Sequence, residues 1–224
     1  MRLGVLVSGR GSNLEAVLRA AAGGRLPGVE PVLVVSNRPG VPALELAAAH
    51  RVPTRVERRS DHASAPDRDA AIGKALTDAG ADLALLAGYD QLLHRPFFHA
   101  FTGRAINIHP SLLPRHGGKG MMGLAVHVAV LAAGDAETGV TLHEVTPRLD
   151  AGPILRQARL PVRPGESAVE LAARVLELEH AMLVEVLADL AAEGGSGGRS
   201  ASMTGASGSR TGPGADQQRS LFDA

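Results

Sequence analysis

The sequence predicts an α/β fold, in which helices flank a Rossmann-like sheet that is open, twisted and mostly parallel. Short apolar runs alternate with helical stretches through the first half of the chain, a pattern typical of parallel strands joined by right-handed crossovers. Two later strand-like runs are separated only by a turn rich in Pro, Asp and Gly, which indicates antiparallel strands late in the chain. A long C-terminal helix completes the expected fold.

Each element expected in the first half has its own local signal. Residues 2–7 form an apolar run that ends at a glycine turn, as buried parallel strands do. The same pattern predicts further strands at residues 31–36, 52–56, 82–87 and 104–108. The alanine- and leucine-rich stretches between them predict helices at residues 12–22, 41–50 and 66–79.

The second half is expected to be more antiparallel and to end in a polar tail. The later elements are a helix at 123–132, strands at 138–145 and 153–162, and a long helix at 166–193. Residues 194–224 contain 8 Gly and 6 Ser among 31 residues, a composition that cannot bury enough surface to offset the entropy of ordering. We therefore expect one domain, residues 1–193, followed by a disordered tail, residues 194–224.

Composition limits the classes of function. The 224 residues carry no formal net charge and no cysteine, which excludes disulfides, thiolate metal sites and a cysteine nucleophile. Charge balance also argues against general nucleic-acid binding. No run approaches the ~20 apolar residues of a membrane helix, and the first residues lack the pattern of a signal peptide. We therefore expect a cytoplasmic protein that contacts neither membrane nor nucleic acid.

The first candidate site is the segment Ser8-Gly9-Arg10-Gly11-Ser12-Asn13, between the first strand and the first helix. Glycines let backbone N–H groups approach an anion, and a helix N-terminus favours negative charge. Ser12 and Asn13 add side-chain donors, so the segment indicates a phosphate site. A tight turn with a helix cap explains the same residues, and the spacing fits neither a Walker loop nor a Gly-x-Gly-x-x-Gly loop.

The second candidate is Asn107-Ile108-His109-Pro110-Ser111-Leu112-Leu113-Pro114. Asn107 and His109 are two residues apart, so on a strand their side chains lie on one face. They stand at the carboxyl end of that strand, where open α/β sheets bind ligands. An amide donor beside an imidazole can polarise a carbonyl and transfer protons. The alternative is a histidine that only caps a loop.

The third candidate is Arg148-Leu149-Asp150-Ala151-Gly152-Pro153. An aspartate in a Gly/Pro-rich turn is commonly a turn former. A carboxylate close to His109 would instead orient that ring and favour its charged form. His143 and Glu144, on the preceding expected strand, are open to the same two interpretations.

Together, the three motifs resemble those of the phosphoribosylglycinamide formyltransferases, a family of folate-dependent formyltransferases. Gly-x-Gly-Ser-Asn, Asn-Ile-His-Pro-Ser-Leu-Leu-Pro and Leu-Asp-x-Gly-Pro follow the family's order and approximate spacing over residues 1–193. The resemblance implies the formyltransferase fold and activity: a formyl group passes from 10-formyltetrahydrofolate to the amine of glycinamide ribonucleotide in purine biosynthesis. It implies no metal.

The resemblance also implies roles for individual residues. The catalytic residues would be Asn107, His109 and Asp150. The ribonucleotide substrate would be held by Gly11, Ser12, Asn13 and Glu179. The folate cosubstrate would be held by Arg68, Asp90, Gln91, Leu92, Leu93 and Asn107.

The chain departs from the family pattern in two places. Tyr89-Asp90-Gln91-Leu92-Leu93 stands where the family often has Phe-Met-Arg/Lys-hydrophobic, so Gln91 takes the place of a commonly basic side chain. Pterin contacts made by the main chain would survive this change, but stacking by the basic side chain would not. The stretch 117–123 resembles a variant branch of the family. We interpret it as a mobile loop on the substrate side, with a phosphate-cradling loop as the alternative.

Three other functions compete with this interpretation. The methionyl-tRNA formyltransferases share the catalytic core but usually carry a further basic domain, and formyltetrahydrofolate hydrolases usually carry an extra N-terminal domain. A ligand-binding protein without activity is the third alternative, against which Asn107, His109 and Asp150 argue. Separately, residues 218–224 resemble the short peptide by which bacterial proteins bind the DNA sliding clamp, although a match of this length arises easily by chance.

Overall fold

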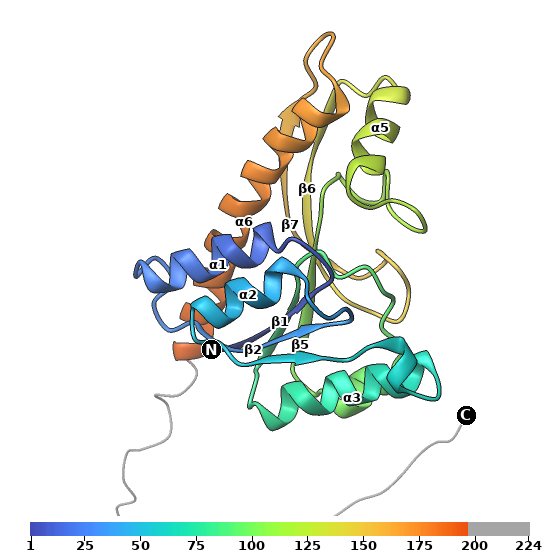
Figure 1. Cartoon of the computed structure of the whole chain (residues 1–224). Coiled ribbons are helices and arrows are strands. Elements are labelled where there is room, and N and C mark those ends of the chain that lie inside the picture. The colour runs from blue at the N-terminus through green and yellow to red at the C-terminus, as the bar shows by residue number, and fades with distance from the viewer. Residues whose placement is uncertain (197–224) are drawn as a thin grey trace, which may run out of the picture.

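The computed structural model describes residues 1–196 and confirms the α/β fold (Figure 1). Its strands are β1 (Arg2–Val7), β2 (Glu30–Ser36), β3 (Thr54–Val56), β4 (Leu83–Leu86), β5 (Arg104–His109), β6 (Glu137–Glu144) and β7 (Ile154–Pro161). They form one seven-stranded sheet in the order β3-β2-β1-β4-β5-β6-β7. Neighbours from β3 to β5 are parallel, whereas β5, β6 and β7 pair antiparallel.

The helices lie close to their expected positions. They are α1 (Ser12–Ala22), α2 (Pro42–Ala49), α3 (Ala65–Asp78), α4 (Arg95–Ala100), α5 (Leu124–Ala132) and α6 (Ala168–Ser196), with a short 3-10 helix, η1 (Arg59–Asp61). The sequence had not predicted α4 or η1, which are too short to show a helical period. The last helix, α6, runs to Ser196 and so extends beyond its expected end at residue 193. The clamp-like residues 218–224 lie outside the described residues.

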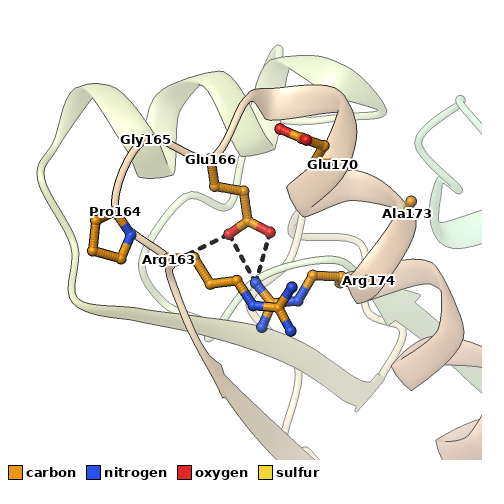
Figure 2. A pocket seen from close by; sticks show the side chains of 7 residues that line it. All are labelled: Arg163, Pro164, Gly165, Glu166, Glu170, Ala173 and Arg174. Carbon is orange, nitrogen blue, oxygen red and sulfur yellow. Dashed lines mark hydrogen bonds and ion pairs between the residues drawn. The ribbon is translucent and has the colours of Figure 1, made fainter.

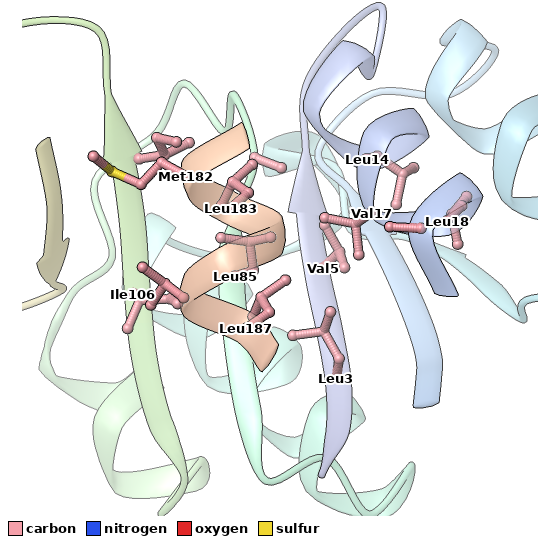
Figure 3. Packing of buried hydrophobic residues seen from close by; sticks show 14 of the residues in the cluster. Leu3, Val5, Leu14, Val17, Leu18, Leu85, Ile106, Met182, Leu183 and Leu187 are labelled. Atoms are coloured by element: carbon pink, nitrogen blue, oxygen red, sulfur yellow. The ribbon is translucent and has the colours of Figure 1, made fainter. Parts of the chain in front are cut away.

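Alternation along the central strands divides the core into two layers. On β1, Leu3, Val5 and Val7 belong to the layer formed with α1 and α6, and Figure 3 shows Leu3 and Val5 between these helices and the sheet. Leu6 belongs to the opposite layer, which includes side chains of α3 and α4. The sheet is therefore buried on both faces, as parallel sheets require.

The topology places one edge of the sheet in reach of several loops. After β3 the chain returns to β4, which lies on the other side of β1 from β2. The loops that follow β1 and β4 therefore diverge to opposite faces, and this switch point opens a crevice at the carboxyl ends of the strands. Within residues 1–196, no helix is long and apolar enough to cross a membrane; the cytoplasmic location stays a prediction.

Candidate active site

A cavity of about 820 Å³ opens at this switch point. Its walls come from the loops after β1, β4 and β5, the glycine-rich stretch 118–124, the turn after β6, and one face of α6. The predicted site residues that line it are Gly11, Ser12, Asn13, Asp90, Gln91, Leu92, Leu93, Asn107, His109, Asp150 and Glu179. Arg68 is the one predicted site residue that is not part of the lining.

His109 is held by a backbone carbonyl that determines which ring nitrogen can react. Its Nε2 lies 2.8 Å from the carbonyl oxygen of His116. Because a carbonyl only accepts hydrogen bonds, Nε2 carries a hydrogen and the neutral ring has a bare Nδ1. That Nδ1 lies 3.9 Å from Oδ2 of Asp150. The reactive nitrogen of His109 therefore faces the carboxylate of Asp150.

Asn107 is oriented by a second histidine across the antiparallel junction. The register of β5 and β6 places Asn107 opposite His143. His143 donates from Nδ1 to the carbonyl of Glu144 at 2.8 Å, so its Nε2 accepts from Nδ2 of Asn107 at 3.1 Å. Burial holds the pKa of His143 below its usual value, although the Glu144 carbonyl and Asp150 oppose this shift. The neutral ring directs the Asn107 amide and leaves its second N–H for a ligand.

Asp150 is fixed by the turn that carries it. Its φ of 48° lies in the left-handed region, which aspartate tolerates better than most residues. Its Oδ2 accepts a hydrogen bond from the backbone N of Gly118 at 2.8 Å. A Cβ at Gly152 would lie 1.8 Å from the carbonyl oxygen of Glu144. The turn therefore reaches β6 closely enough only because glycine stands at that position.

The loop after β1 has the form of an anion site. Gly11 has a φ of 82°, and a Cβ there would lie 2.7 Å from Cβ of Ala43 on α2. The loop is also tied to α2 because the backbone N of Ala43 donates to the carbonyl of Gly9 at 3.2 Å. No side chain of the described chain caps α1 at this end. The N–H groups of its first turn, from Ser12 onward, are therefore available for a negatively charged ligand.

Glu179 brings a buried carboxyl group to the same end of the cavity. Its exposed fraction is 7%, and that of Asn13 is 8%. Burial raises the pKa of Glu179 to about 7, although the amide of Asn13 opposes the shift. Near neutral pH the carboxyl is divided between its protonated and ionised forms, so it can donate or accept a hydrogen bond toward a polar ligand.

Arg68 lies behind the wall formed by residues 90–93. It is 1% exposed, and its guanidinium donates to Oδ1 of Asp69 at 3.0 and 2.6 Å. It also donates to Oε1 of Gln91 at 3.3 Å and to the carbonyl of Leu92 at 3.5 Å. In this arrangement Arg68 supports the wall and has no direct access to a ligand in the cavity.

The formyl transferase family model matches residues 1–187. This chain belongs to the formyl transferase family. Phosphoribosylglycinamide formyltransferase of Haemophilus influenzae is 36% identical over 179 residues, which cover 80% of this chain and 82% of that protein.

Two further relatives define the extent of the similarity. A crystal structure of glycinamide ribonucleotide transformylase 1 from Symbiobacterium toebii superimposes with a TM-score of 0.80 at 37% identity, covering 86% of this chain and 88% of that one. The trifunctional purine biosynthetic protein adenosine-3 of Drosophila melanogaster is 39% identical over 191 residues, although this chain spans 14% of its length. The formyl transferase fold is therefore shown on both sequence and structure.

A second hollow, of about 420 Å³, lies outside the formyl transferase site, at the entry to α6 (Figure 2). Both carboxylate oxygens of Glu166 bind the guanidinium of Arg174, at 2.7 and 2.8 Å, and Oε2 also accepts from the backbone N of Arg163 at 3.1 Å. These groups satisfy one another's hydrogen-bonding capacity, and the contacts stabilise the turn before α6. Among residues 1–196, no three His, Cys, Asp or Glu side chains are grouped to hold a metal ion.

Proposed function

We propose that this protein transfers the formyl group of 10-formyltetrahydrofolate to the amine of glycinamide ribonucleotide, a step of purine biosynthesis. One observation carries the proposal: a single cavity joins the uncapped N-terminus of α1 to the side chains of Asn107, His109 and Asp150. A volume of about 820 Å³ suits a pair of small-molecule substrates of this size. Residues 1–193 would form the catalytic domain.

The residues present fit a folate cosubstrate. A 10-formyl folate supplies a formyl group already bonded to a nitrogen leaving group. The wall at residues 90–93 would offer backbone groups and the exposed side chain of Leu92 to a flat pterin ring, with the buried Leu93 behind them. Asn107 lines the same cavity as this wall and His109, and the N–H of its amide that His143 does not accept would donate to the formyl oxygen. Arg68 would act on this ligand only through Gln91 and Leu92.

The chemistry assigned to the catalytic residues is acyl transfer. As the substrate amine bonds to the formyl carbon, negative charge collects on the formyl oxygen, where Asn107 and protonated His109 donate hydrogen bonds. One such donor typically contributes about 3 kcal/mol of barrier reduction. Asp150 stabilises the positive charge of His109. The attacking nitrogen then loses a proton, and the bond from the formyl carbon to the folate nitrogen breaks. The folate nitrogen, as the leaving group, gains a proton through Nδ1 of His109 or through water.

The anion end of the cavity would hold the substrate in place. The N–H groups that begin α1 and the side chains of Ser12 and Asn13 would bind the 5′-phosphate. Glu179 would accept or donate a hydrogen bond to a polar group of the same substrate. The amine would then point toward Asn107 and His109.

The decisive experiment is an assay of the purified full chain. Glycinamide ribonucleotide and 10-formyltetrahydrofolate are supplied, and both the formylated product and free formate are measured. We expect formylated ribonucleotide in amounts equal to the folate consumed, with little formate. Formate as the main product would indicate a hydrolase, and formylation of methionyl-tRNA but not of the ribonucleotide would indicate the tRNA enzyme; either result overturns the proposal.

A further inference from the structure

Asp90 joins three loops at the carboxyl ends of β1, β2 and β4. Its Oδ1 accepts from Nδ2 of Asn37 at 2.8 Å, and its Oδ2 forms an ion pair with Arg38. Its backbone N donates to Oγ of Ser8 at 3.0 Å. The side-chain amide of Gln91 donates to the same carboxylate at 3.1 Å. The carboxylate therefore joins Gln91 of the wall to Asn37 and Arg38 in the loop after β2. The anion loop is reached through the backbone N of Asp90 and through Arg38, which donates to the carbonyl of Ser8 at 3.4 Å.

The opposite end of this wall is fastened by a second carboxylate. Asp69 accepts from the backbone N of His94 at 2.8 Å and contacts its ring Nδ1 at 2.6 Å. Asp69 also binds Arg68, which in turn donates to Gln91. The wall at residues 90–93 is thus fastened at its start by the contacts of Asp90 and just after its end by the contacts of Asp69 with His94.

The setting of Asp90 makes this junction sensitive to charge. The side chain of Asp90 is 18% exposed, whereas that of Arg38 is 56% exposed. Burial opposes ionisation, but hydrogen bonds from Gln91, Asn37 and Ser8 and the charge of Arg38 together hold the pKa of Asp90 below its usual value. The ionised carboxylate is therefore the form that the surrounding donors select. Its loss would leave several donors in a partly buried site without their acceptor.

We propose that Asp90 is a positioning residue, which fixes the wall at residues 90–93 relative to the anion loop and thereby sets the affinity for the formyl donor. The inference rests on the proposed function and deepens it. It also explains how Gln91 serves in place of a basic residue, because its amide bridges Asp90 and Arg68 and so becomes part of the support of the wall.

Three variants test this role: Asp90→Asn, Arg38→Ala and the double variant. Asparagine retains an acceptor for Asn37 but removes the charge that pairs with Arg38. We expect each single variant to raise the KM for 10-formyltetrahydrofolate about tenfold and to change kcat less than about twofold. The double variant should resemble the single variants, because both remove the same interaction.

A matched control removes an equivalent pair elsewhere. Arg58 and Asp61 form an Arg–Asp ion pair of 2.8 Å on and beside η1, outside the cavity lining. Asp61→Asn should leave both KM values and kcat unchanged. Urea unfolding of every variant separates a loss of folding from a loss of positioning, and direct binding of 10-formyltetrahydrofolate reports on the wall without turnover.

The outcomes are distinguishable. Wild-type donor affinity in Asp90→Asn, or effects of the two single variants that simply add, would overturn the positioning role. A fall in kcat with an unchanged donor KM would overturn it as well, because the defect would then lie in the chemistry. A wild-type chain that binds 10-formyltetrahydrofolate but does not formylate the ribonucleotide would overturn the proposed function, while the binding measurements would still decide the role of Asp90.

Discussion

Two regions of the cavity, the wall at residues 90–93 and the catalytic residues around Asp150, are held in place by different kinds of contact. At the wall end, side chains bind side chains: Asp90, Asn37 and Gln91 are joined at 2.8–3.1 Å. At the catalytic end, the carboxylate of Asp150 lies 3.9 Å from the ring of His109 and 3.7 Å from that of His143. These distances exceed a direct hydrogen bond, and each ring is fixed by a backbone carbonyl instead.

This difference separates binding from chemistry. Groups that only position a ligand can satisfy one another in the free protein. Groups that must exchange a proton or meet a developing charge are more effective when their reactive atoms are held in place but not yet committed to a strong partner. The first end is expected to govern KM and the second kcat.

The largest effect should come from the imidazole. His109→Ala removes both a donor to the formyl oxygen and the group that moves the proton, so kcat should fall by about 10³-fold or more. His99→Ala, at an exposed position on α4, is the matched control and should retain wild-type turnover. Steady-state kinetics with urea unfolding would check this, and near-wild-type kcat in His109→Ala would disprove the assignment.

Asp150→Asn should have the next largest effect. Asparagine can still accept from the backbone N of Gly118, so the turn should keep its conformation. The charge that stabilises protonated His109 is lost, and kcat should fall about 10²-fold with little change in either KM. A variant that lost substrate affinity and kept its kcat would place Asp150 at the binding end instead.

The raised pKa of Glu179 predicts that the free energy of unfolding depends on pH. The folded-state pKa is raised from 4.5 to about 7, so the folded protein binds a proton that the unfolded chain has already released between these values. This stabilisation is complete below about pH 4.5 and is lost as the pH rises through 7.

Glu179→Gln should abolish this dependence. Relative to wild type, the variant should gain about 2 kcal/mol in unfolding free energy between pH 5 and pH 8. Urea titrations at both pH values would measure it, with the exposed neighbour Glu177→Gln as the control. Parallel pH profiles for wild type and Glu179→Gln would contradict the raised pKa.

The smallest effect is expected at Arg10. Its side chain is exposed on the cavity lining, and no hydrogen bond or ion pair engages its guanidinium within residues 1–196. Arg10→Ala should raise the KM for glycinamide ribonucleotide about threefold at low ionic strength, since an exposed charge contributes little. The difference should vanish in high salt because of screening. A salt-independent change would mean that Arg10 shapes the loop.

The sequence predicted the strands and long helices well because each buries a regular pattern of apolar residues. It also predicted that Asn107 and His109 share a face, since that depends only on strand period. It left His143 open between a functional and a structural interpretation, because the role of His143 depends on the register of β6 against β5. Pairing the two expected strands antiparallel was the signal that could have decided it. The position of Arg68 depends on contacts with Gln91 and Leu92, which no local pattern reveals.

The antiparallel register of β5 and β6 determines which side chains meet in the active site. It sets Asn107 opposite His143 and His109 opposite Thr141, and a slip of one residue would turn the donors toward a helix layer. β7 packs closely against β6 and so fixes its position: a Cβ at Gly139 of β6 would lie 2.0 Å from the carbonyl oxygen of Ala158 on β7. Substitutions at Gly139 or on β7, neither of which lines the cavity, should therefore misalign the reacting groups before they unfold the domain.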